Sequence, residues 1–544
     1  MVREKAPKIL LTGNEAGRRK AMREKDLPLI LTIDSGTTSC KAGFVTPYGE
    51  VLAWVKSEKS ASIYFLPRGG AEQNPEECWA IILSTVQRLK EEFPIPPERI
   101  AAIAVTAPWS TTVPVDRDGK PLGNTIMWMD TRGAPYVKEI TRGLLNFQGY
   151  GLSKVFTWVR LTGGIPTHAG KDPIGHILFL KNERPEVYKA AYKFLELKDY
   201  LNLKLTGKLA SDYATITLHW VTDNRDINNV RYDQHLLRLA GIDAEKLPPL
   251  YPTTHVLGPL LPGPAEELGL PPGIPIAIST PDYHASVLGS GALRDYEPHI
   301  YVGTSSWLSC HVPFKKTDLV HNMASLPSAL PGRYFIANEQ ECAGSCLTFL
   351  LNLFFAQDAL GESPYRKLDE LASSAPVGSG GVIFAPWLYG ERTPVEDPSL
   401  RGSFFNISLG TSRAEMVRAV MEGVALNLRW LLPCVEGFIG RKFGDINIIG
   451  GGGSSEIWCQ IFADVLGRPI RQVKDPAAAG LRGLGILASL SLGLSDLESC
   501  TKGVVITKTF KPDPQNHKIY TEIFEAFMQF YRNNRSLFRR LNPI

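Results

Sequence analysis

Three short turns in this sequence are rich in glycine, serine and threonine, and each directly follows an apolar segment. They lie at residues 34–38, 303–306 and 450–454. Glycine frees the backbone to turn, so that successive N–H groups point into one concavity, and the hydroxyl groups add donors. In the first turn we expect Gly36 to take a positive φ. Each turn is therefore a candidate phosphate site, with an ordinary hairpin or a tight strand-to-helix connection as the alternative.

Two carboxylates occupy positions that suit phosphoryl transfer. Asp34 ends the first apolar segment, where it could hold a water on Mg²⁺ but would repel a phosphate. Asp282 follows the apolar segment 274–279, and ligands collect at the carboxyl ends of strands in α/β proteins. A carboxylate there can accept the proton of an attacking hydroxyl. The alternative for Asp282 is an N-cap of the helix that follows.

Common nucleotide fingerprints are absent from the glycine-rich segments. The run at residues 450–454 fits neither GxGxxG nor GxxxxGK[ST]. A nucleotide would therefore be bound without either motif.

The elements that must position these residues can be predicted from apolar patterns. Residues 29–36 and 41–55 predict two strands, the second with a turn at residues 46–49, and residues 99–108 predict a buried strand. A helix should begin after Asn74, which is followed by a proline at the first helical position.

Two further patterns concern the arrangement of strands along the chain. Residues 111–133 predict a hairpin that turns at residues 116–119. A strand, a Gly-Thr/Ser turn and a second strand occur near the start of both halves of the chain, which indicates a duplication.

Composition narrows the class of protein. The 544 residues are 44% hydrophobic, which predicts two or more domains. The net charge of +4, without a Lys/Arg stripe, argues against nucleic acid and a membrane surface as partners. No apolar run reaches the roughly 18 residues of a membrane helix.

The cysteines and the N-terminus carry weaker signals. The eight cysteines lack CxxC spacing, so reduced thiols in a cytoplasmic protein are favoured over a metal site at Cys342 and Cys346. Residues 1–28 are basic but interrupted by acids, which predicts a tail or a short helix rather than a signal peptide.

Taken together, six segments resemble the FGGY carbohydrate kinases, within the superfamily of actin, hexokinase and chaperone ATPases. The resemblance runs from about Leu29 to about Leu494. The segments are DSGTTSCKA (34–42), EQNPEECW (72–79), GTSS (303–306), GERTPVEDPSLRGSF (390–404), AEMVRAVMEGVALNLR (414–429) and GGGGSSEIWCQ (450–460). Each is weak alone, and their shared order is what makes the resemblance specific.

The resemblance implies an α/β fold with two actin-like, ribonuclease H-like domains, each a mixed β-sheet flanked by helices, and a cleft between them. Residues 29–278 would form the sugar-side domain and residues 279–544 the nucleotide-side domain. The implied activity is transfer of the γ-phosphoryl group of ATP, with Mg²⁺, to a hydroxyl of a small sugar. The layout is most similar to xylulokinase-like members, so a pentulose such as xylulose is the first expectation.

The resemblance also carries roles onto individual positions. Asp34 would anchor the magnesium and Asp282 would be the catalytic base. The residues that would bind the nucleotide are Ser35, Gly36, Thr37, Thr38, Lys41, Gly303, Thr304, Gly451, Gly452, Gly453 and Glu456. The residues that would bind the sugar are Trp109, Ser110, Asp130, Asp282 and Tyr283.

The sugar side departs from the family pattern. Xylulokinases have Gln-Met-His-Gly and glycerol kinases Gln-Arg-Glu-Thr where this chain has Pro-Trp-Ser-Thr at residues 108–111. Trp109 could stack on a sugar or pack in the core. Tyr283 replaces the usual Gln or Asn. Further departures are Pro281, His176, Phe179 and Asn406.

Other functions stay open at this stage. The substrate could be ribulose, glycerol, erythritol or gluconate. The chain could also be a non-catalytic ATP-binding relative, or an ATPase that works on protein partners. A homodimer is expected by analogy with relatives.

Overall fold

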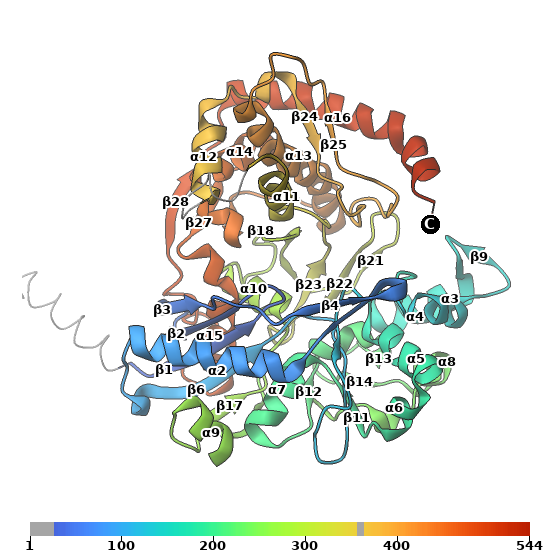
Figure 1. Cartoon of the computed structure of the whole chain (residues 1–544), viewed down its shortest axis with the longest axis vertical. Helices are drawn as coiled ribbons and strands as arrows, with labels where there is room; N and C mark the ends of the chain where they lie inside the picture. The colour runs from blue at the N-terminus through green and yellow to red at the C-terminus, as the bar shows by residue number, and fades with distance from the viewer. Residues whose placement is uncertain (1–26, 356–363, 544) are drawn as a thin grey trace, which may run out of the picture.

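Two mixed β-sheets form the cores of the two halves of the chain, in a computed structural model that describes residues 27–355 and 364–543 (Figure 1). The first sheet has the order β16-β17-β6-β1-β2-β3. Its strands are β1 (Leu29–Ser35), β2 (Cys40–Val45), β3 (Val51–Lys56), β6 (Ile100–Thr106), β16 (Val256–Pro259) and β17 (Pro275–Ala277). β1 pairs antiparallel with β2 and parallel with β6. Every residue of β1 is buried, so both faces of the sheet are covered.

Alternate residues of β1 face two different layers of helix. Leu31 packs with the apolar side of α2 (Pro75–Glu92). Ile30 points the other way and packs with α10 (Asp282–Gly289) and α15 (Ala479–Ser491). This alternation is the period of two that a strand imposes on its side chains. A helix from near the C-terminus therefore covers the first sheet.

The second sheet repeats the strand directions of the first. Its order is β19-β18-β26-β27-β28. Its strands are β18 (His299–Val302), β19 (Ser306–Ser309), β26 (Ile446–Ile449), β27 (Ile470–Val473) and β28 (Ile506–Phe510). β18 pairs antiparallel with β19 and parallel with β26, β26 is parallel to β27, and β27 is antiparallel to β28. Four strands of each half, β17-β6-β1-β2 and β27-β26-β18-β19, share their order and directions, and the duplication itself stays a prediction.

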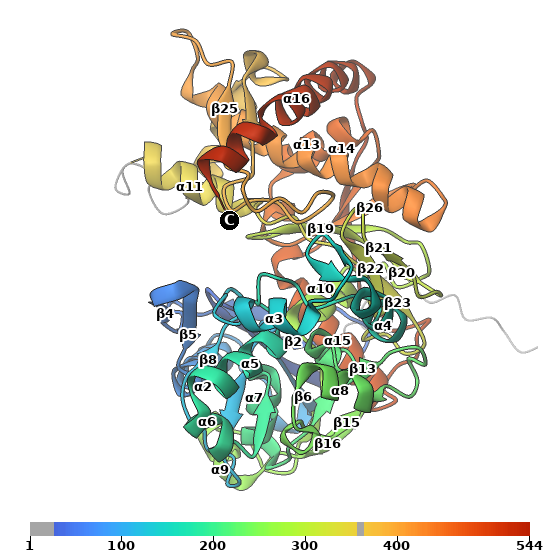
Figure 2. The same cartoon turned by 90° about the vertical axis from the view of Figure 1, so that its right-hand side faces the viewer.

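The helices α10 and α15 lie between the two halves and touch each other closely (Figure 2). A Cβ on Gly289 would lie 1.7 Å from the carbonyl oxygen of Ala479, and a Cβ on Gly483 would lie 1.7 Å from that of Ala285. Both positions therefore need glycine to permit this contact. The contact holds α10, whose first residue is Asp282, against α15.

The remaining elements surround these cores. In the first half they are β4 (Ile63–Leu66), β5 (Gly70–Gln73), β7 (Val113–Val115), β8 (Thr125–Ile126), α3 (Ala134–Thr141), β9 (Asn146–Phe147), β10 (Tyr150–Gly151), α4 (Leu152–Thr162), α5 (Pro173–Glu183), α6 (Pro185–Ala190), β11 (Lys193–Leu195), α7 (Leu197–Thr206), β12 (Ser211–Asp212), β13 (Thr222–Asp223), β14 (Arg231–Tyr232), α8 (Gln234–Ala240), β15 (Leu250–Tyr251) and α9 (Pro262–Leu268). In the second half they are β20 (His311–Val312), β21 (Thr317–Asp318), β22 (Met323–Pro327), β23 (Tyr334–Ala337), α11 (Gly344–Phe354), α12 (Pro364–Ser374), β24 (Ile383–Ala385), β25 (Ser403–Phe405), α13 (Arg413–Ile439), α14 (Glu456–Leu466) and α16 (Pro514–Leu541).

Several local predictions are confirmed. Asn74 caps α2, because its side-chain oxygen accepts the N–H of Glu76 at 2.9 Å. The turn predicted at residues 46–49 joins β2 to β3 and closes with a 3.0 Å hydrogen bond from the N–H of Gly49 to the carbonyl of Thr46.

One predicted hairpin is only partly right. Residues 111–133 do turn at residues 116–119, where the N–H of Gly119 donates to the carbonyl of Asp116. Most of each arm pairs elsewhere, however, since β7 pairs with β11 and β8 with β5. Pro114 and Pro121 have no N–H, so this pair of arms cannot form a full ladder.

Two other expectations are not settled by the structure. Of the predicted tail at residues 1–28, all but the last two residues lie outside the described part of the chain. The domain boundary at residue 278 stays a prediction.

Two further observations concern membrane-spanning helices and the cysteines. In residues 27–355 and 364–543 no helix has the length and apolarity to cross a bilayer. All eight cysteines are free thiols, and all except Cys434 are buried.

Candidate active site

The first turn lies between β1 and β2 and is held from one side. Gln73 donates its side-chain amide to the carbonyl of Thr37 at 3.3 Å, and the Trp128 indole N–H donates to the Thr37 hydroxyl at 3.1 Å. Thr38 is exposed, and Gly36 and Thr37 are half-buried. One side of the turn is thus fixed by the protein while its tip is open to a ligand.

The reason for glycine in this turn differs from the prediction. Gly36 does not have a positive φ. A Cβ on Gly36 would instead lie 3.0 Å from the carbonyl oxygen of Ser39, so a side chain would crowd the tight turn. The prediction of positive φ was wrong because close approach, rather than backbone handedness, restricts this position.

The second turn is joined to the start of α11. The carbonyl of Gly303 accepts the N–H of Gly344 at 2.7 Å, and the carbonyl of Thr304 accepts the N–H of Ala343 at 2.8 Å and the Ser345 hydroxyl at 2.8 Å. The Thr304 side chain is exposed. The backbone of the turn is therefore fixed while its threonine is free to meet a ligand.

The glycine run lies directly against the second turn. Gly450 has φ +86°, and a Cβ there would lie 2.5 Å from the carbonyl oxygen of Val302. A Cβ on Gly452 would also meet Val302, and one on Gly453 would meet Pro476. Gly451, in contrast, is exposed, and a Cβ there would meet no atom within 4 Å. Of the predicted glycines, Gly451 alone faces open space.

This difference predicts that Gly451→Ala spares the fold and weakens ATP use. If a nucleotide lies on this glycine, one added methyl group should raise the KM for ATP roughly five- to tenfold, because an overpacked contact costs about 1 kcal/mol or more. The control is Gly452→Ala, whose Cβ would lie 2.5 Å from the Val302 side chain and should lower thermal stability instead. Steady-state kinetics and melting curves measure both. An unchanged KM in a folded Gly451→Ala would remove this residue from the site.

Asp282 is the first residue of α10, and two backbone groups orient its carboxylate. Its Oδ1 accepts the N–H of Trp109 at 3.1 Å and that of Tyr283 at 2.8 Å. Burial raises the pKa of Asp282 to about 7, and the negative charges of Asp34 and Glu339 add to this, against the two N–H donors. The N-cap of α10 is Pro281, so the alternative of a capping role for Asp282 does not hold.

The charges place the acid and the two turns around one region. Burial alone would lower the pKa of Lys41, yet the charges of Asp34, Tyr301 and Asp282 raise it. Lys41 lies on β2 opposite Asp34, with its Nζ 3.2 Å from Asp34 Oδ2. Tyr301 lies on β18, immediately before the second turn. A hydroxyl compound beside Asp282 would therefore lie between phosphate-type turns from both halves of the chain.

Aromatic rings form one wall next to Asp282. The ring of Tyr283 stacks on Trp307 at 4.0 Å, and Trp307 stacks on Tyr301 at 3.8 Å. Trp109 is half-buried, and its indole N–H donates to the carbonyl of Thr215 at 3.0 Å. The ring of Trp109 packs against a small apolar cluster, so core packing holds it, and its contact with a sugar stays a prediction.

Two residues predicted to bind sugar have other partners here. Ser110 is buried, and its hydroxyl donates to the carbonyl of Lys171 at 2.9 Å. Asp130 is 1% exposed, and its oxygens accept from the Arg132 guanidinium and from the N–H of Ala71. A sugar would have to displace the acceptor of Ser110 and the donors to Asp130, so the geometry favours structural roles for both side chains.

A network of charged residues near Tyr283 was missed. Arg392 contacts Glu339 at 2.6 Å and Glu341 at 2.7 Å, and the Nζ of Lys171 lies 4.0 Å from Glu341. Burial raises the pKa of Tyr283, and the charge of Glu339 adds to this while that of Arg392 opposes it. The available signals were the position of Arg392 in the GERTP segment and the acids that follow the strand β23.

Glu456, predicted to bind nucleotide, faces a different partner. Its carboxylate pairs with Lys508 at 2.5 Å on the surface. Both residues line an open hollow of about 540 Å³, together with Ser373, Ile457, Gln460, Thr509, Phe510 and Lys511. Contact between Glu456 and a nucleotide stays a prediction.

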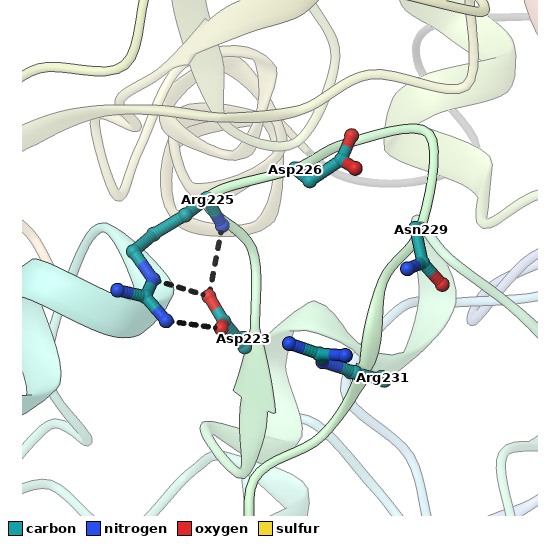
Figure 3. Close-up of a pocket in the computed structure, with 5 residues that line it drawn as sticks. All are labelled: Asp223, Arg225, Asp226, Asn229 and Arg231. Atoms are coloured by element: carbon teal, nitrogen blue, oxygen red, sulfur yellow. Dashed lines mark hydrogen bonds and ion pairs between the residues drawn. The ribbon is translucent and has the colours of Figure 1, made fainter.

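Another hollow lies outside the site, in the loop that joins β13 to β14 (Figure 3). It encloses about 300 Å³ and is lined by Asp223, Arg225, Asp226, Asn229 and Arg231. Arg225 and Asp223 pair within it at 2.7 Å. None of the predicted site residues lines this hollow.

Comparison with known proteins gives an independent result. The model of the FGGY family of carbohydrate kinases, N-terminal domain, matches residues 29–289, and that of the C-terminal domain matches residues 299–492. A gluconokinase from Bacillus subtilis is 28% identical, covering 92% of this chain and 95% of its own. A xylulose kinase from Staphylococcus epidermidis is 26% identical, covering 94% and 97%. The solved structure of a ligand-bound xylulose kinase from Lactobacillus acidophilus superposes with a TM-score of 0.80 at 26% identity, covering 95% of this chain and 100% of that one.

Proposed function

The chain belongs to the FGGY family of carbohydrate kinases, phosphotransferases with an alcohol group as acceptor, and from that premise we propose its reaction. It transfers the γ-phosphoryl group of ATP to a hydroxyl of a small neutral ketose, with a pentulose such as xylulose as the first candidate. Asp282 is the general base. The observation that supports this role is its carboxylate beside the phosphate-type turns, with a pKa raised to about 7.

The residues around Asp34 fit a magnesium ion held together with a nucleotide. Oδ2 of Asp34 pairs with Lys41, and within the described residues no hydrogen bond engages Oδ1. The described part of the chain also contains no group of three or more His, Cys, Asp or Glu side chains that could hold a metal. Mg²⁺ usually combines one or two carboxylates with phosphate oxygens and water, which suits a single acid here. When bound, the ion would offset charge on the phosphates.

The protein groups then have separate tasks. Asp282 accepts the proton of the substrate hydroxyl as the hydroxyl oxygen attacks the γ-phosphorus, and ADP leaves as the bond from that phosphorus to its bridging oxygen breaks. The N–H groups of Trp109 and Tyr283 keep the carboxylate in place. The hydroxyls of Thr38 and Thr304, with the backbone of both turns, face the phosphates. Positioning and electrostatics carry such a reaction, since the protein forms no covalent bond.

The charges near Tyr283 favour a neutral sugar over an aldonate. Arg392 is already paired with Glu339 and Glu341, and Lys171 faces Glu341. A substrate carboxylate would lie near the acids Asp282 and Glu339, and none of the cations named here is unpaired. Binding an aldonate would therefore cost electrostatic free energy. A ketose has only hydroxyl and carbonyl groups, which carboxylates and N–H groups can bind.

The test is ADP release with Mg²⁺ and ATP over pentuloses, hexuloses, polyols and aldonates. We expect kcat/KM to be highest for a pentulose and lowest for gluconate. Preference for gluconate would refute the charge argument and leave the kinase assignment in place. Release of ADP with no sugar dependence would instead favour an ATPase, and no turnover with any sugar would favour a non-catalytic relative.

The remaining proposals concern the cellular location and the oligomeric state of the protein. A cytoplasmic location is supported by the eight free thiols, which persist in a reducing compartment. The homodimer stays a prediction.

A further inference from the structure

The turn that follows β6, at residues 108–111, is held by two carboxylates from distant parts of the chain. The N–H of Trp109 donates to Asp282 at 3.1 Å. The next two N–H groups, those of Ser110 and Thr111, donate to Oε2 of Glu196 at 2.9 and 3.3 Å. Three successive backbone donors are thus shared between the proposed base and one further acid.

Glu196 reaches this turn from the start of α7. It is the residue before the helix, but its side chain does not cap that helix. The first helical N–H, that of Leu197, donates instead to the Thr111 hydroxyl at 2.9 Å. The residue before the helix thus accepts hydrogen bonds from the turn, and the turn accepts one from the first helical N–H. Glu196 is 2% exposed, so its bonds are shielded from water.

The turn needs such support because its backbone is strained. Ser110 has φ +65°, which a residue with a Cβ rarely adopts. Such a conformation persists only where its surroundings enforce it. Without an acceptor for the Ser110 and Thr111 N–H groups, the turn would relax toward an ordinary conformation. Trp109 precedes Ser110 directly, so its N–H would move relative to Asp282.

We propose that Glu196 is a positioning residue for phosphoryl transfer, which holds the strained turn so that the Trp109 N–H stays bonded to Asp282. This inference rests on the proposed role of Asp282 as base. Glu196 itself touches neither substrate nor reacting atoms.

The surroundings of Glu196 indicate which substitution should be tolerated. Burial, followed by the charge of Asp199, raises the pKa of Glu196 well above its ordinary value, although Lys198 and the turn N–H groups oppose this. Its Oε1 lies 3.8 Å from Nδ1 of His219, a buried imidazole whose pKa is lowered to about 3. Burial therefore disfavours the charged form of both Glu196 and His219. A glutamine amide has the same shape, an oxygen for both turn N–H groups, and an N–H for His219.

The experiment compares Glu196→Gln with Glu196→Ala. Glutamine should keep kcat within about twofold, whereas alanine should lower kcat roughly tenfold, because a small misplacement of the reacting groups slows a reaction that depends on positioning. The KM for ATP should stay unchanged. The apparent pKa in the kcat/KM profile should rise in Glu196→Ala, because Asp282 loses the donor N–H of Trp109. The other groups that act on Asp282, namely Asp34, Glu339, Lys41, Tyr301 and the Tyr283 N–H, are the same in both variants.

A matched control separates positioning from stability. Glu422 is also a buried acid that accepts a backbone N–H, that of Gly378 at 3.0 Å, and none of its partners is a predicted site residue. Glu422→Ala should lower thermal stability and leave the kcat and pH profile of the folded fraction unchanged. If Glu196→Ala does not fold, Glu196→Asp replaces it, because it draws the carboxyl back by one methylene group.

Two outcomes would overturn the proposal. One is wild-type kcat and an unshifted pH profile in folded Glu196→Ala or Glu196→Asp. The other is equal loss in Glu196→Gln and Glu196→Ala without a shift in pKa. Failure of the proposed function would look different. In that case the pH dependence of kcat/KM in the wild-type enzyme would remain after Asp282 is replaced.

Discussion

Replacing Asp282 with alanine should lower kcat by roughly 10²–10⁴-fold, the usual contribution of a positioned general base, with little change in nucleotide binding. The carboxylate would no longer take the hydroxyl proton as the phosphoryl group is transferred. Coupled ADP release measures kcat, and calorimetric titration with ADP measures nucleotide affinity. Near wild-type turnover would remove Asp282 from this role.

Asp282→Asn is the matched control for the backbone contacts. Its amide oxygen can still accept the N–H groups of Trp109 and Tyr283, so the start of α10 should keep its structure. If the base is what matters, asparagine should be as slow as alanine. An active asparagine variant would mean that the residue serves only as an acceptor for these two donors.

The pH dependence gives a second measure of the same group. Only the unprotonated carboxylate can accept a proton, and burial raises the pKa of Asp282 to about 7. Wild-type kcat/KM should therefore be maximal above about pH 7 and should fall as the pH decreases through that value. This limb should vanish in Asp282→Asn.

Replacing Asp34 with alanine should weaken magnesium-dependent nucleotide binding by roughly 10- to 100-fold. Asp34 is 7% exposed near the end of β1, and in our proposal it orients a hydrated Mg²⁺ beside the first turn. Titration of ADP with and without Mg²⁺ separates the metal-dependent part of the affinity from the rest. A variant whose affinity keeps the wild-type response to Mg²⁺ would contradict the assignment.

Asp34→Asn has a further readout that does not depend on the metal. The negative charge of Asp34 contributes to the raised pKa of Asp282. Removing that charge should shift the midpoint of the kcat/KM profile to lower pH. The same midpoint in wild type and Asp34→Asn would mean that the two acids do not act on each other.

Local features of the site could be predicted from the sequence. The strand, the glycine-containing turn and the next strand were placed correctly in both halves, because apolar runs and turn residues determine these elements within a few neighbours. The cap at Asn74 is local for the same reason. The prediction of a positive φ for Gly36 failed, because the residue type alone does not reveal the close contact with the Ser39 carbonyl that requires glycine here.

The groups around Asp282 depend on contacts between distant segments. Glu196 and Ser110 are 86 residues apart, and Trp109 and Asp282 are 173 apart. Arg392, in the segment at residues 390–404, likewise pairs with Glu339 and Glu341, which follow β23. No periodicity in the chain records such pairs, because each hydrogen bond depends on where its donor and its acceptor lie after folding.

The amino-acid sequence by itself determined the order of motifs, the turns and the acids that can do the chemistry, since these depend on residue type and short-range backbone preference. The tertiary structure decided the environment of the acid that we propose as the base. Burial beside the charge of Asp34 raises the pKa of Asp282 to about 7, and a carboxylate in water would be a far weaker proton acceptor. Desolvation and charge proximity arise only when both halves of the chain close around the same few residues.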